Sequence, residues 1–188
     1  MTKVFIAGSI GIKNLDSNVM SKINNVISSH YDIVVGDANG VDSSVQHYLS
    51  EKGVKNVTVF CSGDEARNNL GRWGVHQVET KYAPNTRAFY TAKDLAMANS
   101  CNYGLMIWDS KSTGTLNNVL ELLYQSKSSW VYVHKIKDFV KVGNYHDFEN
   151  LLQHMSNVAL EKADKKISLK KKLESFKIQE NNLFSLAR

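Results

Sequence analysis

The sequence predicts an α/β fold with a mostly parallel central sheet, because short β-branched runs alternate with segments of helical periodicity. We expect five of these runs to be strands, namely Lys3–Ala7, Ile33–Val35, Val57–Phe60, Tyr103–Trp108 and Trp130–Val133. Right-handed crossovers bring the carboxyl ends of parallel strands to one edge of the sheet. Ligands of such sheets bind at that edge, at the point where the strand order reverses.

Helical segments separate the predicted strands. Two of them repeat apolar residues at helical spacing, the first at Val19, Ile23, Val26 and Ile27, the second at Val41, Val45, Tyr48 and Leu49. We expect two further helices at Phe89–Asn99 and Thr115–Gln125. The helical pattern resumes after Asp147 and continues into a charged terminal helix, which we expect to dock on the domain or on a partner.

Length and charge favour one domain, residues 1–155, followed by a basic C-terminal helical tail, residues 156–188. The chain has 188 residues and a formal net charge of +5, of which +4 falls in residues 161–188 and +1 in residues 1–160. A basic nucleic-acid-binding surface is therefore weakly supported. The tail lysines form either a local basic patch or a solvated helix face: Lys162, Lys165, Lys166, Lys170, Lys171 and Lys172.

The remaining composition points to a cytoplasmic protein without a metal or cofactor. No signal peptide is recognisable, and no apolar run approaches the ~18 residues of a membrane span, so we expect no membrane association. Cys61 and Cys101 form no CxxC pair, and the histidines lack zinc-ligand spacing. We interpret Cys101 as a packing residue.

Residues 61–87 interrupt the alternation with glycines, asparagines and the single proline, and we expect a long, partly irregular segment there. This segment carries Arg67, Arg72, Trp73 and Arg87. Guanidinium groups bind phosphate and an indole face can stack on a base, so these residues suit an anionic or aromatic ligand. The alternative is a set of surface arginines around a packing tryptophan.

Three tight turns of small residues follow predicted strands, at Ala7-Gly8-Ser9, at Gly36–Asp42 and at Asp109–Thr115. Free backbone N–H groups at such strand-to-helix turns bind anions, and neighbouring helix N-termini can share one phosphate. In the second turn, Asn39 or Asp37 is expected to cap the helix that begins near Val41. In the third, Asp109 could accept a hydrogen bond from a ribose hydroxyl or act as a base.

Lys93 and Asp94 are adjacent on a predicted helix, where consecutive side chains point about 100° apart. We therefore expect at most one of the two to face the pocket. An inward Lys93 would place a cation near phosphate, whereas an inward Asp94 would anchor a loop amide.

The three turns, together with Tyr90–Met97, resemble the SLOG superfamily and most of all its YspA-like branch, over residues 3 to about 135. This resemblance implies a Rossmann-like three-layer sandwich that binds nucleotides or nucleotide-derived ligands. Its members include the Lonely-guy phosphoribohydrolases and the DNA-processing protein A. The chain departs from the Lonely-guy pattern, because Asn118 occupies the position of the catalytic glutamate and Ile10 stands where related members carry arginine.

Three functions remain open from the sequence. The favoured one is a sensing or sequestering module for a nucleotide. The alternative is a nucleotide N-glycosidase or phosphoribohydrolase. If Asp109 is catalytic, Asp109→Asn should abolish turnover but keep nucleotide affinity within about tenfold. That enzyme needs a carboxylate, with Asp109 and Glu121 as the catalytic candidates and Asp37 and Asp42 as further ones. Single-stranded DNA binding ranks third.

We also expect a homo-oligomer. The expected ligand-binding residues are Gly8, Ser9, Gly36, Asp37, Ala38, Asn39, Gly40, Asp42, Arg87, Lys93, Trp108, Asp109, Ser112, Gly114, Thr115 and Asn118.

Overall fold

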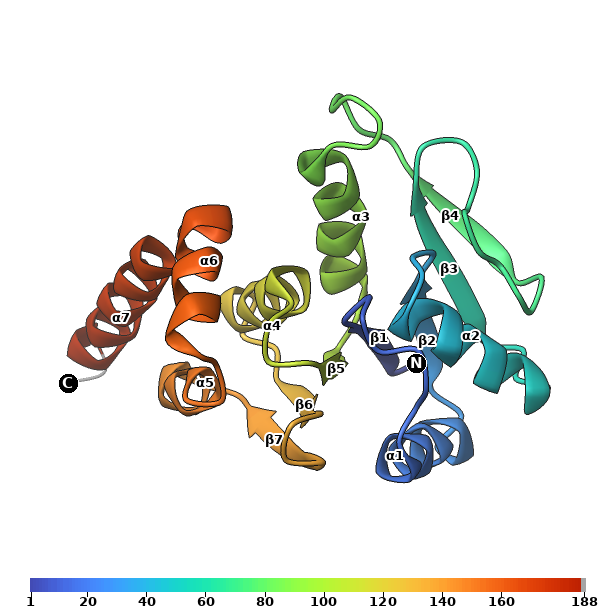
Figure 1. Ribbon diagram of the computed structural model, residues 1–188, viewed down its shortest axis with the longest axis horizontal. Helices are drawn as coiled ribbons and strands as arrows, with labels where there is room; N and C mark the ends of the chain where they lie inside the picture. The colour runs from blue at the N-terminus through green and yellow to red at the C-terminus, as the bar shows by residue number, and fades with distance from the viewer. Residues whose placement is uncertain (187–188) are drawn as a thin grey trace.

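A seven-stranded sheet with the strand order β4-β3-β2-β1-β5-β6-β7 forms the centre of the protein (Figure 1). We describe it from a computed structural model that covers the backbone of residues 1–186 and the side chains of residues 1–178. Strands β1 to β6 are parallel, and β7 runs antiparallel to β6. The strands are β1 (Lys3–Gly8), β2 (Asp32–Gly36), β3 (Val57–Ser62), β4 (Gly74–Val78), β5 (Tyr103–Trp108), β6 (Ser129–Val133) and β7 (Asp138–Val142).

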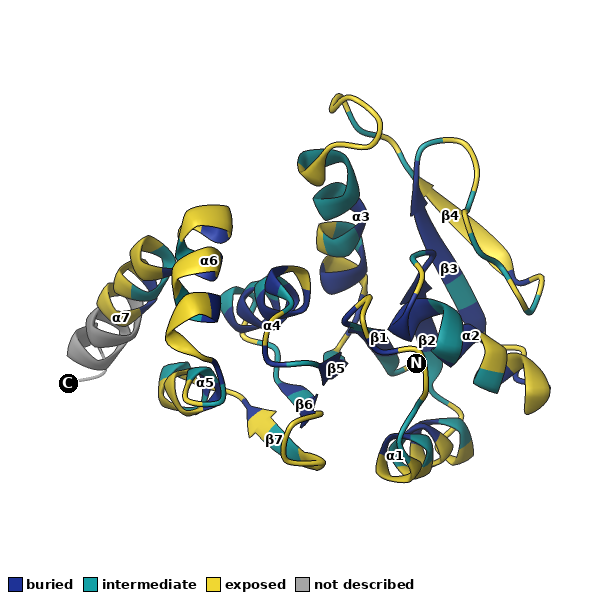
Figure 2. Cartoon of the chain, in the orientation of Figure 1, coloured by how far each residue is buried: buried dark blue, intermediate teal, exposed yellow. Residues whose placement is uncertain are grey.

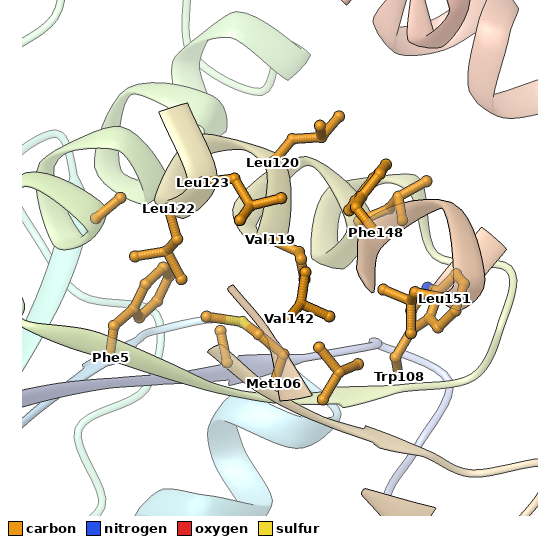
Figure 3. Close-up of a cluster of buried hydrophobic side chains, with 14 of the residues drawn as sticks. Phe5, Met106, Trp108, Val119, Leu120, Leu122, Leu123, Val142, Phe148 and Leu151 are labelled. Carbon is orange, nitrogen blue, oxygen red and sulfur yellow. The ribbon is translucent and has the colours of Figure 1, made fainter. Parts of the chain in front are cut away.

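Helices cover both faces of the sheet, which confirms the predicted α/β sandwich with a C-terminal helical extension. They are α1 (Ser17–Ser28), α2 (Val41–Glu51), α3 (Arg87–Ser100), α4 (Thr113–Tyr124), α5 (Tyr145–Leu152), α6 (Asn157–Ile167) and α7 (Leu169–Leu186). One apolar core joins α1 and α2 to the sheet, and a second core joins α3 to α7 to the opposite face. Figure 3 shows part of the second core, where Trp108 lies beside Leu151 below α4 and α5.

The five predicted strands are all present, but β4 and β7 were not predicted. Both lie at the edges of the sheet, and β4 (sequence GVHQV) is almost entirely exposed (Figure 2). An edge strand is held by backbone pairing to one neighbour and needs no apolar run of its own. Residues 61–87 are therefore less irregular than expected, since β4 pairs with β3 from Thr58↔Gly74 to Ser62↔Val78.

In the described part of the chain, the predicted C-terminal tail contains two helices, α6 and α7, rather than one continuous helix. Ser168 separates α6 from α7 in a left-handed conformation, with φ 52° and ψ 49°. Phe176 of α7 stacks on Tyr145 of α5 and packs edge-on against Tyr124 of α4. The extension thus packs on the same core as the sheet. None of the helices in the described part of the chain is sufficiently long and apolar to cross a membrane.

Candidate functional site

The cleft of interest opens between the carboxyl ends of β1 and β5. The chain leaves β1 toward β2 on one side and leaves β5 toward β6 on the other, so the connections diverge at this point of the sheet. Crevices at such switch points bind ligands in open α/β sheets. The cleft has a volume of about 260 Å³ and is lined by residues of α3 and α4 and of the turns at the sheet edge.

The turn before α4 places backbone N–H groups at the cleft. Asp109 Oδ1 accepts hydrogen bonds from the N–H groups of Lys111 and Ser112, at 2.9 and 2.7 Å. Ser112 then caps α4, since its Oγ accepts from the N–H of Thr115 at 3.3 Å. The first-turn N–H groups of Thr113 and Gly114 have no acceptor within their own helix, and both residues line the cleft. This arrangement is suited to binding an anion.

Ser9 joins the first turn to the third. Its fully buried Oγ accepts a hydrogen bond from the N–H of Asp109 at 3.0 Å and lies 3.5 Å from Thr115 Oγ1. Ser9 does not line the cleft, so its contacts make it a positioning residue for the turn before α4.

Gly8 and Gly40 allow these turns to pack closely. A Cβ atom on Gly8 would lie 2.3 Å from the Ile107 carbonyl oxygen and 2.7 Å from a Val41 methyl group. Gly40 has a φ of 78°, and a Cβ atom there would lie 2.3 Å from the Ile10 carbonyl oxygen. Gly40 is also the N-cap of α2, and no side chain caps that helix. The expected capping by Asp37 or Asn39 is therefore wrong.

A charged cluster of Lys93, Asp37, Asp42 and Asp94 lies at one wall of the site; all but the half-buried Asp94 are buried, and all but Asp37 line the cleft. Lys93 Nζ lies 3.6 Å from Asp37 Oδ1, 3.9 Å from Asp42 Oδ2 and 3.2 Å from Asp94 Oδ1. Lys93 is only 4% exposed. Gly36 makes room for the cluster, because a Cβ atom there would lie 2.3 Å from Asp42 Oδ2 and 2.7 Å from Lys93 Nζ.

Lys93 and Asp94 both line the cleft, so the expectation that only one would face it is wrong. Although the two Cα–Cβ bonds diverge, the long lysine side chain bends back to donate a hydrogen bond to the Asp94 carboxylate. Burial disfavours the charged form of Lys93, but the carboxylates of Asp94, Asp42 and Asp37 outweigh it and raise the pKa of Lys93.

Asp37 is held on its other side by Arg67. The guanidinium donates from Nε to Asp37 Oδ2 at 2.9 Å and from a terminal nitrogen to Oδ1 at 2.6 Å. Burial favours the neutral form of Asp37, but hydrogen bonds from Arg67 and the charge of Lys93 lower its pKa. The Arg67 guanidinium also lies over the Tyr90 ring, 4.5 Å from its centroid, which fixes the segment after β3 above the cleft.

Asp42 differs from Asp37 because no arginine contacts it. It is 5% exposed, and burial raises its pKa to about 6 despite the opposing charge of Lys93. A raised folded-state pKa means that Asp42 in the folded chain keeps its proton while the unfolded chain has lost it. We therefore expect the free energy of unfolding to fall by about 3 kcal/mol as the pH rises from about 4 to above 6, because of this group.

Asp42→Asn tests this dependence, since an amide cannot ionise. The free energy of unfolding, measured by urea denaturation between pH 4 and 7, should decline less steeply with pH in Asp42→Asn than in the wild type. Asp138→Asn, at an exposed position on β7, is the matched control and should keep the wild-type slope. Parallel curves for wild type and Asp42→Asn would contradict a buried, titrating Asp42.

Nine of the predicted binding residues line the cleft: Gly8, Ala38, Asp42, Arg87, Lys93, Ser112, Gly114, Thr115 and Asn118. The others take structural positions beside it or outside it. Asn39 is exposed and accepts a hydrogen bond from Asn68, and Trp108 is 1% exposed in the core, where its Nε1 donates to the Ser112 carbonyl. Trp73 is likewise a packing residue, with its Nε1 donating to the Val54 carbonyl.

The two candidate catalytic residues, Asp109 and Glu121, do not line the cleft. Asp109 is engaged in the turn before α4. Glu121 lies two helical turns into α4, beyond Asn118, and its Oε1 accepts a hydrogen bond from Gln125 at 2.8 Å. A catalytic role for either carboxylate stays a prediction.

Sequence reasoning missed Tyr90 and Thr91, which line the cleft from α3. With the predicted Arg87 and with Asp94 they occupy positions i, i+3, i+4 and i+7 of one helix. That spacing puts the four residues on one face of the helix. Polar residues with this period, in a helix beside a predicted site, were the sequence signal that could have identified this polar face.

Comparison with known proteins gives a likeness in fold. No family model and no curated protein matches the sequence. The DNA processing protein A of Helicobacter pylori, solved in a study of its single-stranded DNA binding mode, aligns with a TM-score of 0.57 and 16% identity over 82% of this chain and 74% of its own. The DNA processing protein A of Streptococcus pneumoniae aligns with a TM-score of 0.53 and 19% identity, over 81% of this chain and 56% of its own. The chain thus shares the α/β fold found in the DNA processing protein A structures.

Proposed function

We propose that this protein binds a nucleotide or a nucleotide-derived small molecule in the cleft between β1 and β5 and acts as a sensing or sequestering module. The observation that carries the proposal is the position of the α4 N-terminus, whose Thr113 and Gly114 line a cleft at the switch point of a parallel sheet. A phosphate group there would accept hydrogen bonds from backbone N–H groups and interact favourably with the helix dipole.

The opposite wall of the cleft suits the rest of a nucleotide. Tyr90 offers an aromatic surface, Thr91 a hydroxyl group, and Arg87 a guanidinium group at the first turn of α3. Aromatic rings stack on bases, and guanidinium groups bind phosphate oxygens. The four sequence motifs and the fold together support membership of the SLOG superfamily, whose members bind such ligands.

A nucleotide N-glycosidase or phosphoribohydrolase is the second candidate, and Asp42 is the observation that favours it. Asp42 lines the cleft, and its raised pKa of about 6 is close to the value a general acid needs near neutral pH. Against this reaction, Asn118 lines the cleft at the position of the Lonely-guy glutamate, and an amide cannot supply that charge. Single-stranded DNA is the third candidate and rests on the likeness in fold, which does not by itself transfer a function.

A thermal-shift screen tests the proposal with nucleoside mono-, di- and triphosphates, ADP-ribose and its cyclic forms, NAD and cyclic dinucleotides. A ligand at about 100 times its Kd stabilises the folded state by about 2.7 kcal/mol, which raises Tm by roughly 5 to 11 °C for a chain of this size. Each ligand that binds is then recovered and analysed for cleavage.

An intact ligand supports the binding module, whereas a released base supports the hydrolase. Asp42→Asn should then abolish release and leave ligand affinity within about tenfold. If no small molecule shifts Tm and oligo(dT) binds with a steep salt dependence, the protein is a single-stranded DNA binder and the proposal is wrong.

A further inference from the structure

A second pocket lies beside the cleft, enclosed by α3, α4, α6 and α7. Its volume is about 240 Å³. Arg87, Thr91 and Asn118 line this pocket and the cleft alike, so the two cavities adjoin along these residues. The C-terminal extension supplies its outer wall through Lys166 of α6 and Lys172 of α7.

Three cations from three separate elements converge on the second pocket: Arg87, Lys166 and Lys172. One carboxylate, that of Glu121, also lines it. Within residues 1–178, none of the three cations lies within 4.0 Å of a carboxylate oxygen, and the Glu121 carboxylate instead accepts a hydrogen bond from Gln125. The pocket therefore carries an excess of positive charge.

Lys172 is the most constrained of these cations. It is half-buried, and its Nζ donates a hydrogen bond to Asn117 Oδ1 at 2.6 Å, which directs the ammonium group to the pocket side of α4. Burial lowers the pKa of Lys172, and the positive charge of Arg87 acts in the same direction, against the attraction of Glu121. An anion bound between Lys172 and Arg87 would offset both the burial of the ammonium group and its repulsion from Arg87, because it would stabilise the charged form of Lys172.

We propose that the second pocket binds a further phosphate group of the ligand held in the cleft, so that the preferred ligand is a small nucleotide with two separate phosphates, such as a dinucleotide. The inference rests on the proposed function. One phosphate lies at the N-terminus of α4, and the other lies between Arg87, Lys166 and Lys172. The C-terminal extension thereby selects for longer ligands over mononucleotides.

The test compares four nucleoside 5′-monophosphates with the 5′-phosphorylated homodinucleotides pApA, pGpG, pCpC and pTpT, by calorimetry on the full chain. The double variant Lys166→Gln/Lys172→Gln removes two cations from the pocket. Lys165→Gln/Lys171→Gln is the matched control, because it removes the same charge from exposed neighbours on the same two helices. Neither Lys165 nor Lys171 lines the second pocket.

We expect a dinucleotide to bind at least about tenfold more tightly than its mononucleotide, and the pocket variant to lose that advantage, since charge-assisted hydrogen bonds to phosphate are lost. The control variant should keep the advantage, and mononucleotide affinity should stay within about twofold in both variants. Equal affinities for mono- and dinucleotides, or equal losses in the two variants, would overturn the second phosphate site while the proposed function stands.

Two further results would contradict more than the second phosphate site. If no mononucleotide or dinucleotide binds, the second phosphate site fails, and the proposed function fails with it only if the full thermal-shift screen also finds no ligand. If affinity continues to rise from two to eight linked nucleotides, the pocket is part of a strand-binding surface, and the assignment to a small ligand is wrong.

Discussion

Replacing Lys93 with methionine should destabilise the protein by about 3–5 kcal/mol at pH 7.5, because it leaves buried carboxylates without their shared cation. Lys93 lies within 4 Å of Asp37, Asp42 and Asp94, and Asp42 has no arginine to replace it. The free energy of unfolding from urea denaturation measures the loss. Lys111→Met removes the same charge from an exposed position and should change stability by less than about 0.5 kcal/mol.

The pH dependence of the loss identifies its source. Without Lys93, the folded-state pKa of Asp42 should rise further above about 6, while the unfolded value stays near 3.8. The folded variant then favours the protonated carboxyl group, so its stability falls as the pH rises through that pKa. The deficit relative to wild type should be smaller at pH 5 than at pH 7.5. Adding Asp42→Asn to Lys93→Met should recover part of the loss at pH 7.5, and a deficit independent of both pH and Asp42 would contradict the charged cluster.

The sequence predicted those parts of the fold that depend on local pattern. The strand Tyr103–Trp108 was placed with its observed bounds, since it is a continuous apolar run between polar turns. The turn at Ser112–Thr115 was also predicted, because a hydroxyl residue followed by a helical apolar period is a local N-terminal signal. Edge strands β4 and β7 carry no such signal, since each is held by backbone pairing to one neighbour and is mostly exposed or half-buried instead of forming a continuous apolar run.

The site was harder to predict because its chemistry comes from contacts between distant segments. Asp37 appeared to be a helix cap in the sequence, but Arg67, thirty residues later, binds its carboxylate. Asp109 appeared to be a free carboxylate at the end of a strand, but the next turn uses it. Lys93 was expected to meet either phosphate or solvent, whereas three carboxylates surround it. Only the fold determined the partners that Asp37 and Lys93 find in distant segments, whereas Asp109 is engaged by N–H groups of its own turn, two and three residues later.

Replacing Gly8 with alanine should cost about 3 kcal/mol or more and should disrupt the cleft, because the new methyl group has no space. It would lie 2.3 Å from the Ile107 carbonyl oxygen of β5 and 2.7 Å from Val41 of α2, both of which belong to rigid elements. Removing this clash requires the ends of β1 and β5 to separate, and that movement also displaces the N-terminus of α4. We therefore expect a lower Tm and a loss of nucleotide affinity together.

Gly114→Ala separates the loss of stability from the loss of nucleotide affinity. A Cβ atom at Gly114 would clash with nothing, because the nearest atom, Ser112 Oγ, lies 4.0 Å away. Alanine is also the better helix former, so the stability of Gly114→Ala should match or exceed that of the wild type. The added methyl group nevertheless occupies the cleft beside the first-turn N–H groups. Loss of nucleotide affinity in a fully stable Gly114→Ala would show that the ligand approaches the α4 backbone, whereas wild-type affinity there would place the phosphate elsewhere.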